Sequence, residues 1–200
     1  MKKRMGYACI TAIATAALAA AAGCTTIQAR STVPINVSRH VELQSRDMSS
    51  LNYSPDLIVM FGIESPAHAG VSGGGGPVGE FRRDGRPGET GVTCCTTLPS
   101  DWQPDLKLTV RWLAYMDDGN RVAKSWYKAE SVRIPQYDGR QAGTTWAIFL
   151  PGHRVKIMVA DENANGHNSV AVHPADNDPY VVQGVRDEES NRLYLSGSKQ

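Results

Sequence analysis

The sequence predicts an all-β fold, an antiparallel β-sandwich or barrel with little helix outside an N-terminal signal peptide. Three observations support this prediction. Apolar and polar residues alternate along several segments, turn signals separate those segments, and no stretch after residue 30 has the apolar stripe of a helix. Short strands joined by regular turns are typical of antiparallel sandwiches and barrels.

The clearest strand covers residues 106–112, LKLTVRW, where every second side chain is apolar. Residues 153–160, HRVKIMVA, repeat this pattern. The apolar faces of these two strands consist of Leu106, Leu108, Val110 and Trp112, and of Val155, Ile157 and Val159. Further strands are expected at residues 37–43, 57–63, 90–97, 129–134, 146–150, 169–173 and 180–183, separated by turn signals at residues 117–120, 137–140, 150–153 and 163–168.

The N-terminus has the features of a secretory signal peptide, assigned to residues 1–23. A basic start is followed by an uncharged, Ala-rich run that ends in small residues. The run leads into AAGC, which resembles the lipobox of bacterial lipoproteins, in which the cysteine thiol, here that of Cys24, is acylated and becomes the new N-terminus. Ala21 departs from that pattern, which prefers Leu at its position. Ordinary cleavage near Ala20 and Ala22, giving a soluble periplasmic protein, and a retained transmembrane helix are the alternatives.

An acylated Cys24 would anchor the chain to the cell envelope on the periplasmic side. Thr25 in place of Asp favours the outer membrane over the inner, by resemblance to the sorting rule of enteric lipoproteins. The remaining chain divides into a lipidated N-terminus and tether (24–36), a single β domain (37–185) and a polar C-terminal tail (186–200). Removal of the signal peptide takes away three of the 21 basic residues, which leaves 18 basic against 20 acidic side chains. The mature chain therefore has a slightly negative net charge, and no nucleic-acid partner is expected.

Two adjacent cysteines remain in the mature chain. Of the four cysteines, Cys9 leaves with the signal peptide and Cys24 carries the lipid, which leaves Cys94 and Cys95. In the oxidising envelope these two can form a vicinal disulfide. The alternative is a strand in which the two thiols face opposite sides. A metal site at the doublet is disfavoured, because no second cysteine or close histidine pair flanks it.

No catalytic residue and no cofactor is predicted. Residues 74–79 spell G-x-G-x-x-G, but Pro77 interrupts the motif and no helix is expected after it. Ser125 and Lys128 spell S-x-x-K without the companion motifs of those acyl enzymes. The five histidines are scattered along the chain.

One segment has the spacing of a calcium loop. In DENANG, Asp161, Asn163 and Asn165 occupy positions 1, 3 and 5 of such a loop. Position 12, however, is Val172 in place of the bidentate Glu. Asn165 followed by glycine is by itself a hairpin turn signal. The hairpin is the favoured interpretation, so no metal site is predicted.

A series of motifs runs through the middle of the chain: a glycine run, Cys-Cys, Pro-x-x-Trp-x-Pro, a strand ending in Val-Arg-Trp, and Val-x-x-Pro-x-Tyr. In this order they resemble a family of bacterial envelope lipoproteins of unknown function, over most of residues 52–175. Asp105 departs from the family, which often has Gly there, and residues 77–91 lengthen the connection between the glycines and the cysteines. The resemblance depends on Cys94, Cys95, Pro99, Trp102, Pro104, Val110, Arg111, Trp112, Pro135 and Tyr137.

Members of that family are similar to proteins encoded beside type VI secretion effectors, especially phospholipases. The resemblance therefore implies an immunity protein, with no enzymatic activity of its own, that neutralises a secreted phospholipase by occlusion. The alternative is a structural or assembly lipoprotein of the envelope without a toxin partner. An enzymatic function ranks below both.

The candidate partner-binding loop lies within residues 70–91. It carries Phe81, Arg82, Arg83 and Arg86, and arginine and aromatic side chains are favoured interface anchors. The alternative is a mobile, solvated loop without a binding role.

Overall fold

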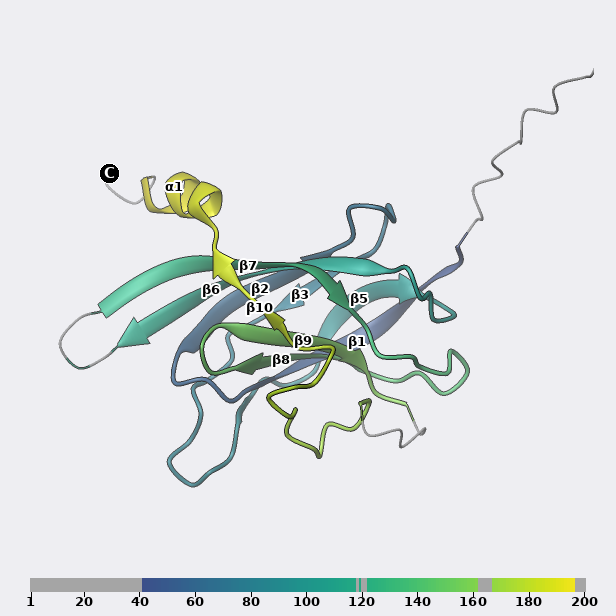
Figure 1. The fold of residues 1–200 in the computed structure, drawn as a ribbon, viewed down its shortest axis with the longest axis horizontal. Coiled ribbons are helices and arrows are strands. Elements are labelled where there is room, and N and C mark those ends of the chain that lie inside the picture. The colour runs from purple at the N-terminus through teal and green to yellow at the C-terminus, as the bar shows by residue number, and fades with distance from the viewer. Residues whose placement is uncertain (1–40, 118, 120–121, 162–166, 197–200) are drawn as a thin grey trace, which may run out of the picture. The chain divides into compact units, whose positions relative to one another are not determined.

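The structure, a computed structural model, describes residues 41–117, 119, 122–161 and 167–196. In that part of the chain, all strands belong to one 11-stranded sheet, and one short helix follows them (Figure 1). The all-β prediction is confirmed. The strands are β1 (Leu43–Asn52), β2 (Leu57–Glu64), β3 (Ser72–Gly75), β4 (Gly88–Glu89), β5 (Thr93–Pro99), β6 (Lys107–Asp117), β7 (Val122–Arg133), β8 (Thr145–Leu150), β9 (Arg154–Val159), β10 (Val182–Gln183) and β11 (Val185–Arg186), and the helix is α1 (Glu188–Ser196).

The sheet is barrel-like and nearly closed on itself. Its strand order is β10-β9-β8-β1-β5-β3-β2-β6-β7-β11, with β4 paired to β1 outside this path. The two ends of the order, β10 and β11, are separated in the chain by Gly184 alone. Since β10 pairs with β9 and β11 pairs with β7, one short segment joins both edges. The Gly184 NH donates to the carbonyl of His153 at 2.8 Å.

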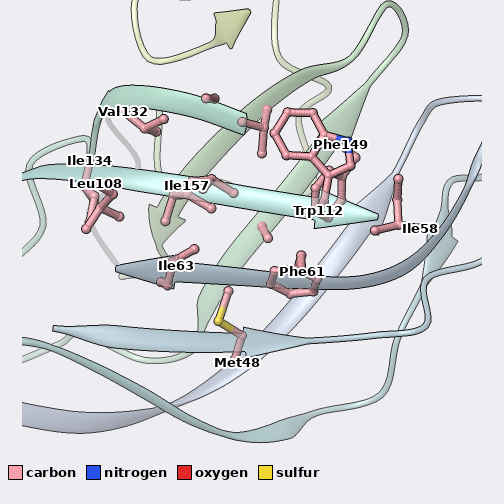
Figure 2. Packing of buried hydrophobic residues seen from close by; sticks show 14 of the residues in the cluster. Met48, Ile58, Phe61, Ile63, Leu108, Trp112, Val132, Ile134, Phe149 and Ile157 are labelled. Carbon is pink, nitrogen blue, oxygen red and sulfur yellow. The ribbon is translucent and has the colours of Figure 1, made fainter. Parts of the chain in front are cut away.

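The barrel interior is filled by the apolar faces that the sequence alternation predicts (Figure 2). All four apolar residues predicted for segment 106–112 are at most 2% exposed. The three predicted for β9 belong to the same cluster. Trp112 lies within an aromatic group, with its ring centroid 5.8 Å from those of Tyr127 and Phe149.

The second half of β1 and the neighbouring strands β8 and β9 are buried on both faces. Alternate residues of a strand point to opposite faces, and those pointing away from the interior form a second apolar cluster. Segment 167–181, which leads to β10, covers this cluster with Val170 and Val181. The predicted strand at residues 169–173 is therefore wrong, because these residues form turns across the outer face of the sheet. The members of the second cluster are Leu51, Ile148, Leu150 and Met158.

The glycine run forms strand β3 between β2 and β5. A Cβ atom on Gly74 would lie 2.5 Å from the Phe61 carbonyl oxygen, and one on Gly73 would lie 2.8 Å from the Thr96 hydroxyl. These strands therefore approach more closely than any side chain allows. The glycines serve sheet packing.

Helix α1 lies within residues 186–200, where the sequence predicts a polar tail and shows no helical pattern of apolar residues. Asp187 caps it, because its carboxylate accepts from the backbone NH of Ser190 at 3.2 Å and from its hydroxyl at 2.8 Å. The Asn191 side-chain amide accepts from the backbone NH of Trp126 at 2.8 Å and donates to the backbone carbonyl of Trp126 at 3.2 Å. The cap, the Asn191 hydrogen bonds and the Tyr194 ring, whose centroid lies 5.1 Å from that of Trp126, thus hold this helix against β7. Among the described residues, no helix has the length and apolar character needed to cross a bilayer.

Candidate partner-binding surface

The part of the predicted binding segment 70–91 that follows β3, residues 77–91 (loop 77–91), is fixed along its base. Val78 exchanges two backbone hydrogen bonds with Ile58, at 2.8 and 3.0 Å. The Phe81 NH donates to the Ser54 carbonyl at 3.0 Å. On the returning side, β4 pairs with the last two residues of β1, and the Thr90 NH donates to the Ser50 carbonyl at 3.2 Å. The loop is therefore anchored to the C-terminal end of β1 from both sides.

Asn52 connects this loop to the barrel. Its side chain is fully buried, and its amide nitrogen donates to the carbonyls of Asp56 at 2.6 Å and Gly79 at 2.9 Å. Its amide oxygen accepts from the Ser54 NH at 2.9 Å and the Ser54 hydroxyl at 2.7 Å. A buried amide that uses both ends is a rigid connection, because any movement leaves polar atoms unpaired.

The tip of the loop is a tight turn. The Arg82 NH donates to the Arg86 carbonyl at 2.8 Å, and Gly85, with φ of 82°, supplies the left-handed residue. The Arg86 guanidinium donates to Asp84 Oδ2 from Nε at 2.9 Å and from Nη2 at 2.6 Å. Hydrogen bonds from the side chain and backbone of Arg86 lower the pKa of Asp84. Arg86 thus shapes the turn, whereas Arg82 and Arg83 are exposed and, within the described chain, form no ion pair.

An aromatic row extends from the loop. Phe81 is 42% exposed, and its ring lies 6.1 Å from that of Tyr53. The Tyr53 ring lies 4.4 Å from the imidazole of His173 in an edge arrangement. Burial raises the pKa of Tyr53. The row combines partly exposed apolar area with fixed geometry, which is what an interface anchor requires.

A cavity of about 360 Å³ adjoins the row at His173, lined also by Lys156, His167, Val172 and Asp178. Lys156 Nζ donates to Asp178 Oδ2 at 2.8 Å, and the two side chains are 3% and 7% exposed. Burial acts to raise the pKa of Asp178, but the hydrogen bonds from Lys156 and the Tyr180 NH and the nearby positive charges outweigh it and lower the pKa. The pair fastens segment 167–181 to the outer face of β9.

A second titratable cluster lies at the same end of the barrel. Asp56 Oδ2 and His153 Nδ1 are 3.6 Å apart, and the imidazole stacks on Tyr127 with 3.8 Å between ring centroids. Burial lowers the pKa of His153 and raises the pKa of Asp56, each opposed by the charge of the other. Burial also raises the pKa of Tyr127. Sequence reasoning missed this cluster and the aromatic row, because their members are far apart in the chain and have no common motif.

The remaining predicted site residues are placed as follows. Cys94 and Cys95 lie exposed on β5, bonded as a disulfide across a cis peptide bond. Cys24, Asn163 and Asn165 lie outside the described residues, and Asp161 accepts from the Asp138 NH at 2.8 Å. Within the described ranges, no group of three or more His, Cys, Asp or Glu side chains could hold a metal ion.

The cysteine pairing is tested by mass spectrometry. Without reductant, the folded domain is expected to take up no alkylating agent at Cys94 or Cys95, although both are exposed, because each thiol is bonded to the other. With reductant, it is expected to gain two alkyl groups. Cys94→Ser serves as the control, since it leaves one thiol that reacts without reductant. Two alkyl groups on the unreduced wild type would contradict the pairing.

The fold and these surfaces define an all-β protein with a nearly closed, barrel-like sheet and with polar side-chain clusters where connecting segments pack against its strands. The chain belongs to a family of which no function is known. The family model described as "Protein of unknown function (DUF3304)" matches residues 51–157, just over half of the 200-residue chain. The match runs from the end of β1 into β9 and includes loop 77–91. A comparison with curated proteins finds no match.

Proposed function

We propose that the protein is a lipid-anchored binding protein of the cell envelope that neutralises a type VI secreted phospholipase by occlusion. The observation that supports this most is the anchored loop 77–91, which presents Phe81, Arg82 and Arg83 in a defined conformation. A loop already fixed in its binding shape loses less conformational entropy when it meets a partner. The lipobox-like sequence supports the lipidation and the envelope location, and the family resemblance supports the phospholipase partner.

The position of the loop agrees with this proposal. The chain enters the barrel at Leu43, where the Glu42 carbonyl accepts from the Ser100 NH at 2.8 Å. The loop is anchored at the other end of β1, which has ten residues and so spans about 30 Å. The described chain therefore enters the barrel at the end that is remote from loop 77–91.

The anchoring role of Phe81 is tested by affinity. Phe81→Ala is expected to weaken binding to the proposed phospholipase partner about 30-fold, because truncation of a central aromatic anchor costs about 2 kcal/mol or more. Arg82→Ala with Arg83→Ala is expected to slow association and to reduce its salt dependence. Isothermal titration and stopped-flow association measure both effects.

Met60→Ala is the matched control, since Met60 is 43% exposed against 42% for Phe81 and lies on β2 outside the surface. It is expected to bind as the wild type does. Unchanged affinity in the triple variant of Phe81, Arg82 and Arg83 would exclude the loop as the binding site.

A competition assay tests the immunity function itself. A deletion strain is expected to be killed by its parent only when the parent's secretion system is active, and to be rescued by the wild-type gene. Cys24→Ser is expected to rescue less well, because the protein is no longer confined to the membrane. No fitness defect in the deletion strain would favour the structural lipoprotein instead.

A further inference from the structure

A second surface lies at the end of the barrel where the chain enters. The segments around Trp102 and Tyr137 enclose a groove of about 670 Å³. Its other lining residues include Asp101, Gln136 and Arg140. Because β1 pairs Leu43 with Pro99 at this end, the groove and loop 77–91 lie at opposite ends of β1. The groove therefore takes no part in the partner-binding surface.

The walls of the groove are tied together. Trp102 Nε1 donates to the Ile134 carbonyl at 3.1 Å, and the Tyr137 hydroxyl donates to the Pro99 carbonyl at 2.6 Å. These two bonds run in opposite directions between the two walls. Burial of this hydroxyl raises the pKa of Tyr137 to about 12, so it remains a donor at any physiological pH.

Arg46 adds further hydrogen bonds between the two walls of the groove. Its guanidinium, in a residue 7% exposed, donates to the Ala142 carbonyl at 2.8 Å and to the Ser100 carbonyl at 3.2 Å. It also lies 5.6 Å from the centroid of the Tyr137 ring. Gly139 touches the Ser100 carbonyl so closely that no Cβ fits between them. The groove is thus pre-formed, and binding in it requires little ordering of its walls.

The polar side chains of the groove remain open to a ligand. In the described part of the chain, those of Asp101, Gln136 and Arg140 make no hydrogen bond or ion pair. Asp138 accepts from the Arg140 backbone NH at 2.9 Å through Oδ1. Acceptors, donors and an amide that supplies both therefore line the groove beside the partly exposed Trp102, whereas the Tyr137 side chain is only 3% exposed.

The charges and hydrogen-bonding groups that line the groove indicate the chemical class of its ligand. Two carboxylates against one guanidinium disfavour a phosphate or another anion. A cation would be repelled by the Arg140 guanidinium and would make no use of the Gln136 donors, and an apolar ligand would displace water from the polar groups without replacing its hydrogen bonds. Only a ligand whose groups both donate and accept, and which has flat apolar faces to lie against an aromatic ring, fits the whole set. We infer that the groove binds a saccharide, namely a short neutral oligosaccharide.

A nuclear magnetic resonance titration tests this inference on the folded domain. Three neutral trisaccharides are used as probes: the trimer of N-acetylglucosamine, maltotriose and mannotriose. The chain has four tryptophans, and the indole NH signal of Trp102, assigned with Trp102→Phe, is expected to shift with at least one probe while the other three indole signals stay in place. Asp101→Asn is expected to weaken that binding about tenfold or more.

Asp105→Asn is the matched control, because Asp105 is equally an exposed aspartate near this end but does not line the groove. It is expected to bind the probe as the wild type does. The inference is overturned if no probe shifts the Trp102 signal at about 10 mM, a concentration that would nearly saturate a millimolar site. It is also overturned if Asp101→Asn and Gln136→Ala bind the probe with unchanged affinity.

Discussion

Asp178→Ala is expected to lower the free energy of unfolding by about 3–5 kcal/mol. The substitution leaves the Lys156 ammonium, 3% exposed, without its partner beneath segment 167–181. An unpaired buried charge is among the few changes that destabilise a protein this strongly. Urea unfolding followed by tryptophan fluorescence measures the effect.

Two controls distinguish the buried pair from an ordinary ion pair. Asp176→Ala removes the partner of Arg154 a short distance away, but the Asp176 side chain is 91% exposed, so the expected loss is below about 1 kcal/mol. The double variant Lys156→Met with Asp178→Leu is expected to recover most of the stability, because it leaves no charge unpaired. Equal losses for Asp178→Ala and Asp176→Ala would show that the pair does not stabilise this segment.

The same pair predicts a dependence on pH. The pKa of Asp178 in the folded protein lies below its ordinary value of 3.8, so its ionised form stabilises the fold. This contribution is complete above the ordinary carboxyl pKa and is lost as the pH falls below about 4 through the lower, folded value. Asp178→Asn is therefore expected to flatten the acid limb of the stability curve relative to the wild type.

Trp112→Ala is expected to cost about 3–5 kcal/mol, the range for removing a large aromatic side chain from a core. Trp112 is 1% exposed and packs against Tyr127 and Phe149. Its ring also touches Gly184, which has no room for a Cβ against it. Gly184→Ala is accordingly expected to cost about 1–3 kcal/mol through overpacking.

A double-mutant cycle separates this contact from general core damage. If the Trp112 ring is what excludes a side chain at Gly184, then Gly184→Ala should cost less in the Trp112→Ala background than in the wild type. Ala123→Gly on β7, remote from Gly184, serves as a control that should add independently. Strict additivity of Trp112→Ala and Gly184→Ala would contradict the packing of Gly184 against Trp112.

The strands that fill the barrel could be predicted, since their apolar residues alternate. Strand β1 could not, because LQSRDMSSLN has no such alternation. Its small polar residues are buried by bonds to loop 77–91, such as that from the Ser49 hydroxyl to the Thr90 carbonyl at 3.1 Å. Those partners lie far along the chain, so local sequence carries no signal of the burial.

The candidate surface was predictable only in part. The exposed positions of Phe81, Arg82 and Arg83 follow from a long polar loop, and the structure agrees. Arg86 is different, because its neighbour Asp84 engages it within the turn, and Arg86 therefore offers less to a partner than predicted. Tyr53 and His173 join the surface through tertiary packing alone.

The strand order along the chain has a consequence for biosynthesis. Residues 182–186 emerge from the ribosome after every other strand, yet they pair with both β7 and β9. Until they arrive, a nascent chain carries two unpaired strand edges, which are templates for aggregation and targets for chaperones. Pairing of residues 182–186 with β9 and β7 removes both edges in one step. The protein therefore gains protection from aggregation abruptly and late, and a transcript truncated upstream of this point would yield a product that quality control can recognise.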